Sequence, residues 1–91
     1  MCTELYRAVE EQLLRHEGIR LTPYRDSVGK LTIGVGRNLD DVGITEDEAR
    51  IMLRNDIEKA KAIPAKYVAN FAELPKPKQA ALINMCFNLG E

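Results

Sequence analysis

The sequence predicts an α+β fold, in which one helix is followed by a small antiparallel sheet and then by further helices. Three observations predict it. Apolar residues recur at helical spacing between residues 3 and 17, and a glycine follows them. Residues 31–36 alternate in character and are rich in β-branched side chains, as strands are. Thr45 and Glu48 form a capping box ahead of a second run with helical spacing.

The first predicted helix covers residues 3–17. Thr3 is expected as its N-cap. Gly18 is expected to end it, because glycine takes the left-handed conformation of a C-terminal cap at the least cost. The apolar face of this helix consists of Leu5, Val9 and Leu13 with the neighbouring Ala8 and Leu14.

A small sheet is predicted to follow. Residues 19–24 are expected to be extended, since Pro23 keeps them out of a helix. Residues 27–30 have turn chemistry, and residues 31–36 form the next strand. Two or three short antiparallel strands are the simplest arrangement.

The second half of the chain is predicted to be helical. The helix that begins at the capping box runs over residues 45–63, where Pro64 should end it. Residues 66–72 suggest a short helical turn, and the prolines within residues 74–77 are expected to interrupt helical structure again. The last helix, residues 78–89, is apolar almost all round, and such a helix is normally surrounded by other structure.

Length and composition predict one small domain. The chain has 91 residues, of which 45% are hydrophobic, so it can form one core but not two independent ones. We expect a single domain made of three parts, residues 1–44, 45–63 and 64–91. The 13 basic and 14 acidic residues give a net charge of -1, which argues against nucleic-acid binding.

The compartment predicted from the sequence is the cytosol. No segment has the pattern of a signal peptide, and none has the length needed to insert into a membrane. Cys2 and Cys86 lie near opposite ends of the chain and have no ligand neighbour at CxxC spacing. This favours reduced thiols and no metal site.

Four residues could carry chemistry. Glu17 lies at a predicted helix C-terminus, where partial negative charge disfavours an ionised carboxylate and so favours a general acid; a solvated surface charge is the alternative. Asp26 lies in a turn, where aspartates usually bond to their own backbone. Thr32 fits ordinary strand composition. His16 has no second ligand at metal spacing, which favours a structural or solvated residue over a metal ligand.

Taken together and in order, these residues resemble the signature of phage-type lysozymes. The chain contains His16-Glu17-Gly18, Pro23-Tyr24-Arg25-Asp26 and Leu31-Thr32-Ile33-Gly34-Val35-Gly36. In the resembled family a Glu-Gly ends the first helix, a Tyr-x-Asp follows, and a Thr-Ile-Gly-x-Gly strand comes next. The helix from Thr45 looks like the family's connecting helix, and residues 78–91 look like the central helix of its second lobe.

The resemblance implies a bacteriolytic glycoside hydrolase that cleaves peptidoglycan at the β-1,4 bond between N-acetylmuramic acid and N-acetylglucosamine. Glu17 resembles the general acid, Asp26 the second carboxylate, and Thr32 the hydroxyl that helps to place the attacking water. An inverting reaction needs the two carboxyls about 6.5–9.5 Å apart, but the sequence leaves the stereochemistry open. No cofactor is implied. Gly34 and Gly36 either let the backbone approach a sugar or serve as strand bends.

Further expectations concern the rest of the chain. Arg37 stands where T-even phage lysozymes carry a histidine, and we expect it to pair with Asp56. The family continues beyond residues 78–89, so we expect a chain shortened within the second lobe, with this helix buried between two copies. The resemblance to phage endolysins implies that a separately encoded pore protein would release the chain to the wall. The alternative to an active enzyme is an inactive fragment that acts as a binding or regulatory module.

Overall fold

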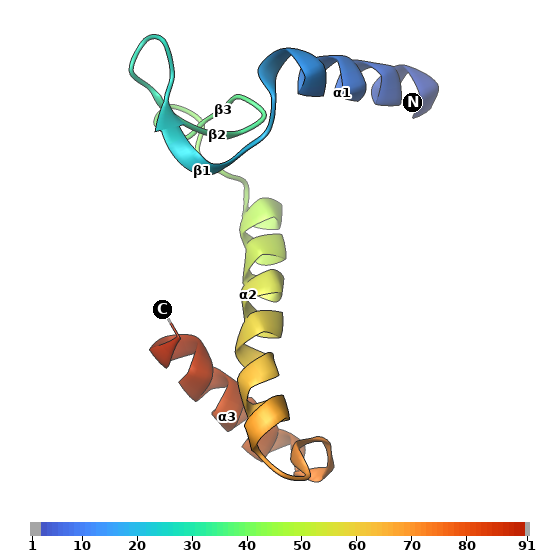
Figure 1. Cartoon of the computed structure of the whole chain (residues 1–91), viewed down its shortest axis with the longest axis vertical. Helices are drawn as coiled ribbons and strands as arrows, with labels where there is room; N and C mark the ends of the chain where they lie inside the picture. Colours follow the sequence, from blue (N-terminus) through green and yellow to red (C-terminus); the bar gives the residue numbers. More distant parts are fainter. Residues whose placement is uncertain (1–2, 91) are drawn as a thin grey trace. The chain divides into compact units, whose positions relative to one another are not determined.

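The computed structural model describes residues 3–90 of the chain. In chain order these residues form α1 (Thr3–Glu17), β1 (Arg20–Arg25), β2 (Leu31–Gly34), β3 (Arg37–Asn38), α2 (Glu46–Tyr67), the 3-10 helix η1 (Phe71–Glu73) and α3 (Lys76–Leu89) (Figure 1). The predicted α+β class is confirmed. The chain divides into two compact units, residues 1–44 and residues 45–91.

In the first unit, α1 ends at the predicted residue. Glu17 is the last helical residue, and the N–H of Gly18 donates to the carbonyl of Leu14 at 2.9 Å. Gly18 has a φ of 69°, which glycine adopts at little cost. Thr3 is already helical among the described residues, so the prediction that it is the N-cap is wrong. Helix boundaries read from local sequence are often off by a residue or two.

The sheet has the order β1-β2-β3, and both pairs of strands are antiparallel. Thr32, on the central strand, lies opposite Tyr24 on β1 and Asn38 on β3. The strand expected over residues 31–36 ends earlier, at Gly34. The backbone departs from the extended conformation at Gly34, the last residue of β2, and again at Gly36, with φ values of 71° and 75°.

In the second unit, α2 begins with the predicted capping box. The N–H of Glu48 donates to Thr45 Oγ1 at 3.1 Å, and the N–H of Thr45 donates to Glu48 Oε1 at 2.8 Å. The expected end of this helix at residue 63 is wrong, because α2 continues to Tyr67 with Pro64 inside it. Pro64 is buried, and burial of its ring offsets part of the cost of the missing N–H.

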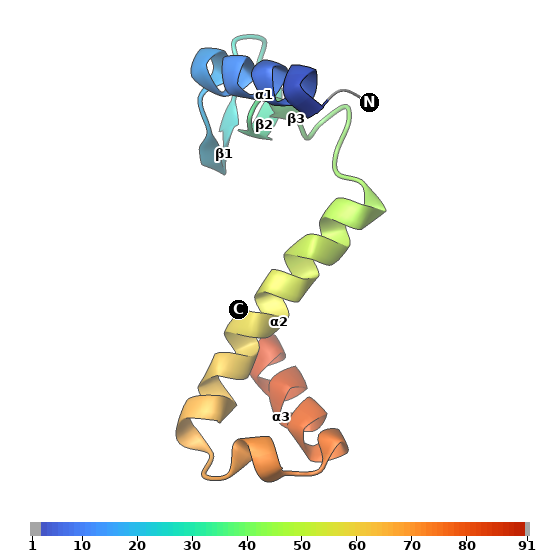
Figure 2. The same ribbon diagram turned by 90° about the vertical axis from the view of Figure 1, so that its right-hand side faces the viewer.

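The two long helices of this unit pack side by side, as Figures 1 and 2 both show. Between them, the helical turn expected over residues 66–72 is instead the end of α2 followed by η1. Phe71 of η1 is buried, as are Ala60 and Pro64 of α2. α3 begins at Lys76, two residues before the prediction, because a proline in the first helical turn sacrifices no hydrogen bond.

α3 does not have the surroundings that its apolar sequence suggested. None of its residues is buried in the described part of the chain, and Met85 and Leu89 are 50% and 78% exposed. None of the helices between residues 3 and 90 is long and apolar enough to cross a membrane.

Candidate active site

Glu17 is positioned by the end of α1 and by the turn that follows β2. Its side chain is exposed, and its carboxyl lies beside Gly36. A Cβ on Gly36 would lie 3.7 Å from Glu17 Cδ and 3.9 Å from its Oε1. An alanine at position 36 would therefore be in ordinary van der Waals contact with this carboxyl.

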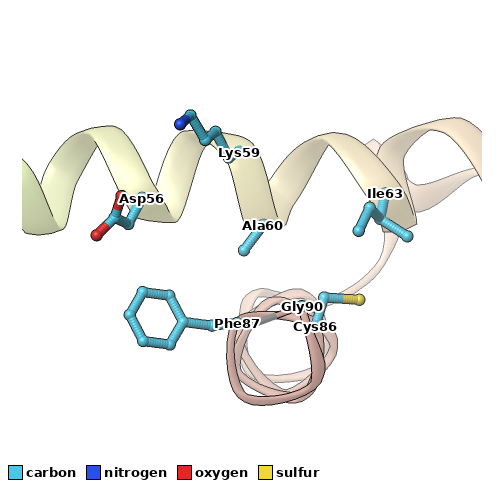
Figure 3. Close-up of a pocket in the computed structure, with 7 residues that line it drawn as sticks. All are labelled: Asp56, Lys59, Ala60, Ile63, Cys86, Phe87 and Gly90. Atoms are coloured by element: carbon cyan, nitrogen blue, oxygen red, sulfur yellow. The ribbon is translucent and has the colours of Figure 1, made fainter. Parts of the chain in front are cut away.

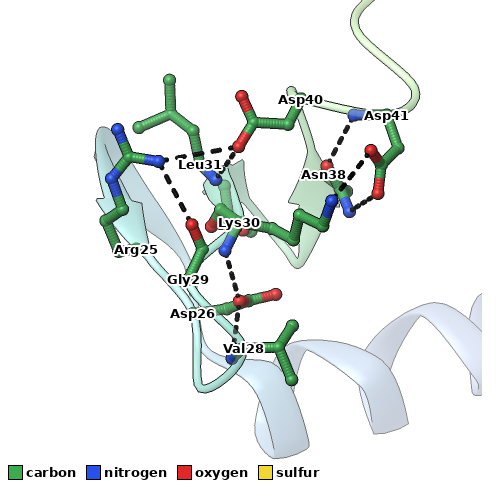
Figure 4. A network of polar contacts seen from close by, with 10 residues as sticks. Arg25, Asp26, Val28, Gly29, Lys30, Leu31, Asn38, Asp40 and Asp41 are labelled. Carbon is green, nitrogen blue, oxygen red and sulfur yellow. Dashed lines mark hydrogen bonds and ion pairs between the residues drawn. The ribbon is translucent and has the colours of Figure 1, made fainter.

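Asp26 is fixed by the turn between β1 and β2. Its Oδ1 accepts the N–H of Val28 at 3.0 Å and the N–H of Lys30 at 2.8 Å (Figure 4). The turn is closed by the N–H of Gly29, which donates to the carbonyl of Asp26 at 2.9 Å. The turn role considered from the sequence is therefore observed, and both of these side-chain bonds use a single carboxylate oxygen.

Thr32 is the most buried polar residue of the described chain, with 3% of its surface exposed. Its hydroxyl donates to the carbonyl of Lys30 at 2.9 Å. With its proton committed to that carbonyl, the hydroxyl oxygen offers only its lone pairs to a further partner. A water molecule beside it would therefore be bound as a donor.

One residue connects two of the three predicted site residues. The N–H of Lys30 donates to Asp26, and the carbonyl of Lys30 accepts from Thr32. The backbone of Lys30 therefore holds both side chains at the start of β2. Glu17 is held instead at the other end of β2, against Gly36. All three lie in the first unit and are arranged around β2.

A network of polar contacts fastens the Asp26 turn to the loop after β3 (Figure 4). Asp40 Oδ2 accepts the N–H of Leu31 at 2.7 Å and lies 3.6 Å from Arg25 Nη1. Lys30 Nζ lies 3.2 Å from Asp41 Oδ1. Both ion pairs are solvent-exposed and contribute little by themselves. Together with the Leu31 N–H bond to Asp40, they connect the turn and the loop at several points.

The sequence reasoning missed this network. Local spacing indicates only turn chemistry for Asp40 and Asp41, because the contacts that reach β2 and the Asp26 turn span 9 to 15 residues of sequence. Strand register brings them together, and that register was not predicted. The one available signal was that basic residues flank the Asp26 turn.

Arg37, on β3, is anchored to the loop that follows this strand, since its Nη1 donates to the carbonyl of Gly43 at 3.2 Å. The expected pair with Asp56 would connect the two units, and it stays a prediction. His16 is exposed in the last turn of α1. Among residues 3–90, no group of three or more histidine, cysteine, aspartate or glutamate side chains is arranged to hold a metal ion.

The second unit contains a pocket of about 310 Å³ between α2 and α3 (Figure 3). Asp56, Lys59 and Cys86 are among its lining residues. Cys86 is a partly buried free thiol, while Cys2 lies outside the described residues. None of the three predicted site residues lines this pocket, so it is separate from the candidate active site.

Comparison with known proteins identifies the family. The family model described as phage lysozyme matches residues 14–91, a range that includes Glu17, Asp26 and Thr32. No curated protein matched the chain. The matched range covers the end of α1, the whole sheet and the helices that follow. The chain belongs to the phage lysozyme family.

Proposed function

We propose that this chain is a muramidase, which hydrolyses the β-1,4 bond between N-acetylmuramic acid and N-acetylglucosamine. Membership of the phage lysozyme family implies a peptidoglycan hydrolase in general. The bond that is cut and the residues that cut it are our proposal. Glu17, Asp26 and Thr32 carry the reaction, and no cofactor is involved.

In this mechanism the Glu17 carboxyl gives its proton to the glycosidic oxygen as the bond from that oxygen to the sugar C1 breaks. A water molecule attacks C1 from the opposite face of the ring. Asp26 takes the proton that the water loses, so that the two carboxyl groups exchange protonation states over one turnover. This division of roles is the one that inverting glycosidases use.

The observation that carries the proposal is the shared attachment of Asp26 and Thr32 to Lys30. Asp26 uses Oδ1 for its turn, so Oδ2 is the oxygen that would act as the base. Thr32 has its proton committed to a carbonyl, so its oxygen would accept a hydrogen bond from the attacking water. Two acceptors fixed by one backbone segment would orient such a water before the reaction.

A lysis assay tests the proposal. The purified chain is added to outer-membrane-permeabilised bacteria beside the Glu17→Gln variant, which keeps the shape of the side chain but cannot donate a carboxylic proton. Glu11→Gln, another exposed glutamate of α1, is the matched control. We expect lysis by the wild type and by Glu11→Gln, and its loss in Glu17→Gln. Equal lysis by all three proteins would contradict the role of Glu17.

A binding or regulatory module is the second candidate, and the exposed apolar face of α1 favours it. Leu5, Val9 and Leu13 are 65%, 45% and 49% exposed, and with Val35 they line an open hollow. Apolar patches of this kind mark surfaces that bind partners. Such a module would bind peptidoglycan or a protein without turnover, so the wild type and Glu17→Gln would be equally inactive in the lysis assay.

We also propose that two copies associate through α3, whose Met85 and Leu89 side chains are exposed. Burial of these side chains against a second copy would remove apolar surface from water. Sedimentation of the chain at several concentrations tests the idea, and a monomer at every concentration would contradict it. In the cell, we expect the chain in the cytosol until release to the wall, which fractionation before and after lysis would test.

A further inference from the structure

The peptide group between Lys30 and Leu31 is bound on both of its sides. Its carbonyl oxygen, from Lys30, accepts the hydroxyl of Thr32 at 2.9 Å and the N–H of Asp26 at 2.9 Å. Its N–H, from Leu31, donates to Asp40 Oδ2 at 2.7 Å (Figure 4). A peptide group is planar, so its carbonyl and its N–H cannot turn independently of each other. Asp40 and the Thr32 hydroxyl are therefore connected through one rigid group.

Asp40 binds the edge of β2 at a point where β3 has already ended. The last residue of β3 is Asn38, and the N–H of Leu39 still donates to the carbonyl of Leu31 at 2.7 Å. The N–H of Leu31 is bound by a side chain, the Asp40 carboxylate. A hydrogen bond to an ionised acceptor is roughly twice as strong as a neutral one. It also polarises the peptide group, so that the carbonyl on the other side becomes a better acceptor.

Asp41, the next residue in the chain, contacts the same segment in a different way. Its Oδ1 lies 3.2 Å from Lys30 Nζ, at the end of a flexible side chain. Its Oδ2 accepts the side-chain amide of Asn38 at 3.0 Å. Neither contact reaches the peptide group that binds the Thr32 hydroxyl. The two neighbouring aspartates therefore differ in one respect: Asp40 binds the backbone of β2, and Asp41 binds a side chain.

We propose that Asp40 is a positioning residue for Thr32. Through the Lys30–Leu31 peptide group, Asp40 fixes the carbonyl to which the Thr32 proton is committed. It thereby keeps the hydroxyl oxygen in its role as the acceptor for the attacking water. This inference rests on the proposed function for its catalytic meaning. The orientation of the Thr32 side chain is a structural property that can be measured without any activity.

The test compares three variants of the full chain with the wild type. Asp40→Ala removes the acceptor, Asp40→Asn keeps an oxygen acceptor without the charge, and Asp41→Ala is the matched control. NMR couplings from the Thr32 methyl carbon to the backbone nitrogen and carbonyl carbon measure its rotamer populations. We expect a single rotamer in the wild type, Asp40→Asn and Asp41→Ala, and averaging between rotamers in Asp40→Ala. The same single rotamer in all four proteins, or averaging in both alanine variants, would overturn the inference.

Hydrolysis rates supply a second measurement. Release of soluble sugar from purified peptidoglycan should fall roughly tenfold in Asp40→Ala, since misplacement by about 1 Å can cost a hundredfold in rate. Asp40→Asn should restore most of the rate, and Asp41→Ala should retain it. Equal losses in the two alanine variants would assign the effect to the loop as a whole and would overturn the inference. An inactive wild type would refute the proposed function, while the couplings would still decide whether Asp40 positions Thr32.

If Asp40→Ala does not fold, the wild type alone provides a measurement. A scalar coupling across the hydrogen bond is expected between the Leu31 nitrogen and the Asp40 carboxyl carbon. The bond from the Leu39 N–H to the Leu31 carbonyl has the same length, 2.7 Å, and serves as the internal standard. We expect both couplings in one spectrum. The Leu39 coupling without the Asp40 coupling would overturn the inference.

Discussion

Asp26 combines a structural and a proposed chemical task, and the two use different atoms. Oδ1 accepts two backbone N–H groups and shapes the turn. We assign proton uptake to Oδ2. Taken alone, the sequence favoured a turn aspartate, and the hydrogen bonds agree with that interpretation. Chemistry at the same residue is our proposal, which rests on the resemblance of its motif to the lysozyme signature.

Two substitutions at Asp26 separate these tasks. Asp26→Asn keeps a side-chain oxygen that accepts both N–H groups, so this variant should unfold at nearly the wild-type temperature but should lose most of its activity. Asp26→Ala removes the acceptor and should lower the free energy of unfolding by about 1–3 kcal/mol. Thermal denaturation and release of soluble sugar from purified peptidoglycan measure the two effects. Full activity in Asp26→Asn would exclude a catalytic role for Asp26 and would leave only its structural role in the turn.

Two substitutions at Thr32 likewise separate the role of the hydroxyl group from the role of the side-chain shape. Thr32→Val keeps the branched side chain but leaves the carbonyl of Lys30 without this donor, which should cost about 1–3 kcal/mol of unfolding free energy. It should also remove activity, whereas Thr32→Ser should retain much of it. Thr22→Val, at an exposed position on β1, is the matched control. Comparable activity in Thr32→Val and Thr22→Val would show that the hydroxyl of Thr32 has no role in the reaction.

At the level of elements, local chemistry was the part that the sequence could predict. Gly18 ends α1, and the capping box begins α2, because each depends on residues within one helical turn. Pro64 was misinterpreted because burial, which the sequence pattern did not reveal, keeps it inside α2. The contacts of Arg25 and Asp40 depend on strand register over longer distances, so they could not be predicted from local spacing.

The capping box gives a prediction for α2. Thr45→Ala removes the side-chain acceptor for the N–H of Glu48, and it should lower the free energy of unfolding by about 0.5–2 kcal/mol. Thr45→Ser keeps the acceptor and should cost much less. Chemical denaturation followed by circular dichroism measures both variants. If the alanine and serine variants were equally stable, the cap would contribute nothing to stability.

At the level of the whole molecule, the sequence predicts a link between the two units through Arg37 and Asp56. A double-mutant cycle with Arg37→Ala, Asp56→Ala and the double variant measures it by denaturation. Residues in one ion pair typically show coupling of about 0.5–3 kcal/mol, and we expect a value in this range. Additive effects of the two substitutions would contradict the pair.

The most direct measurement of the central claim is the identity of the sugar at the newly formed reducing ends. Purified peptidoglycan is digested with the wild-type chain or with Glu17→Gln, reduced with borohydride, and analysed by mass spectrometry. A muramidase leaves N-acetylmuramic acid at the reducing end, so we predict reduced N-acetylmuramic acid from the wild type and none from Glu17→Gln. Reduced N-acetylglucosamine, or no new ends from the wild type, would contradict a muramidase that uses Glu17 as its acid.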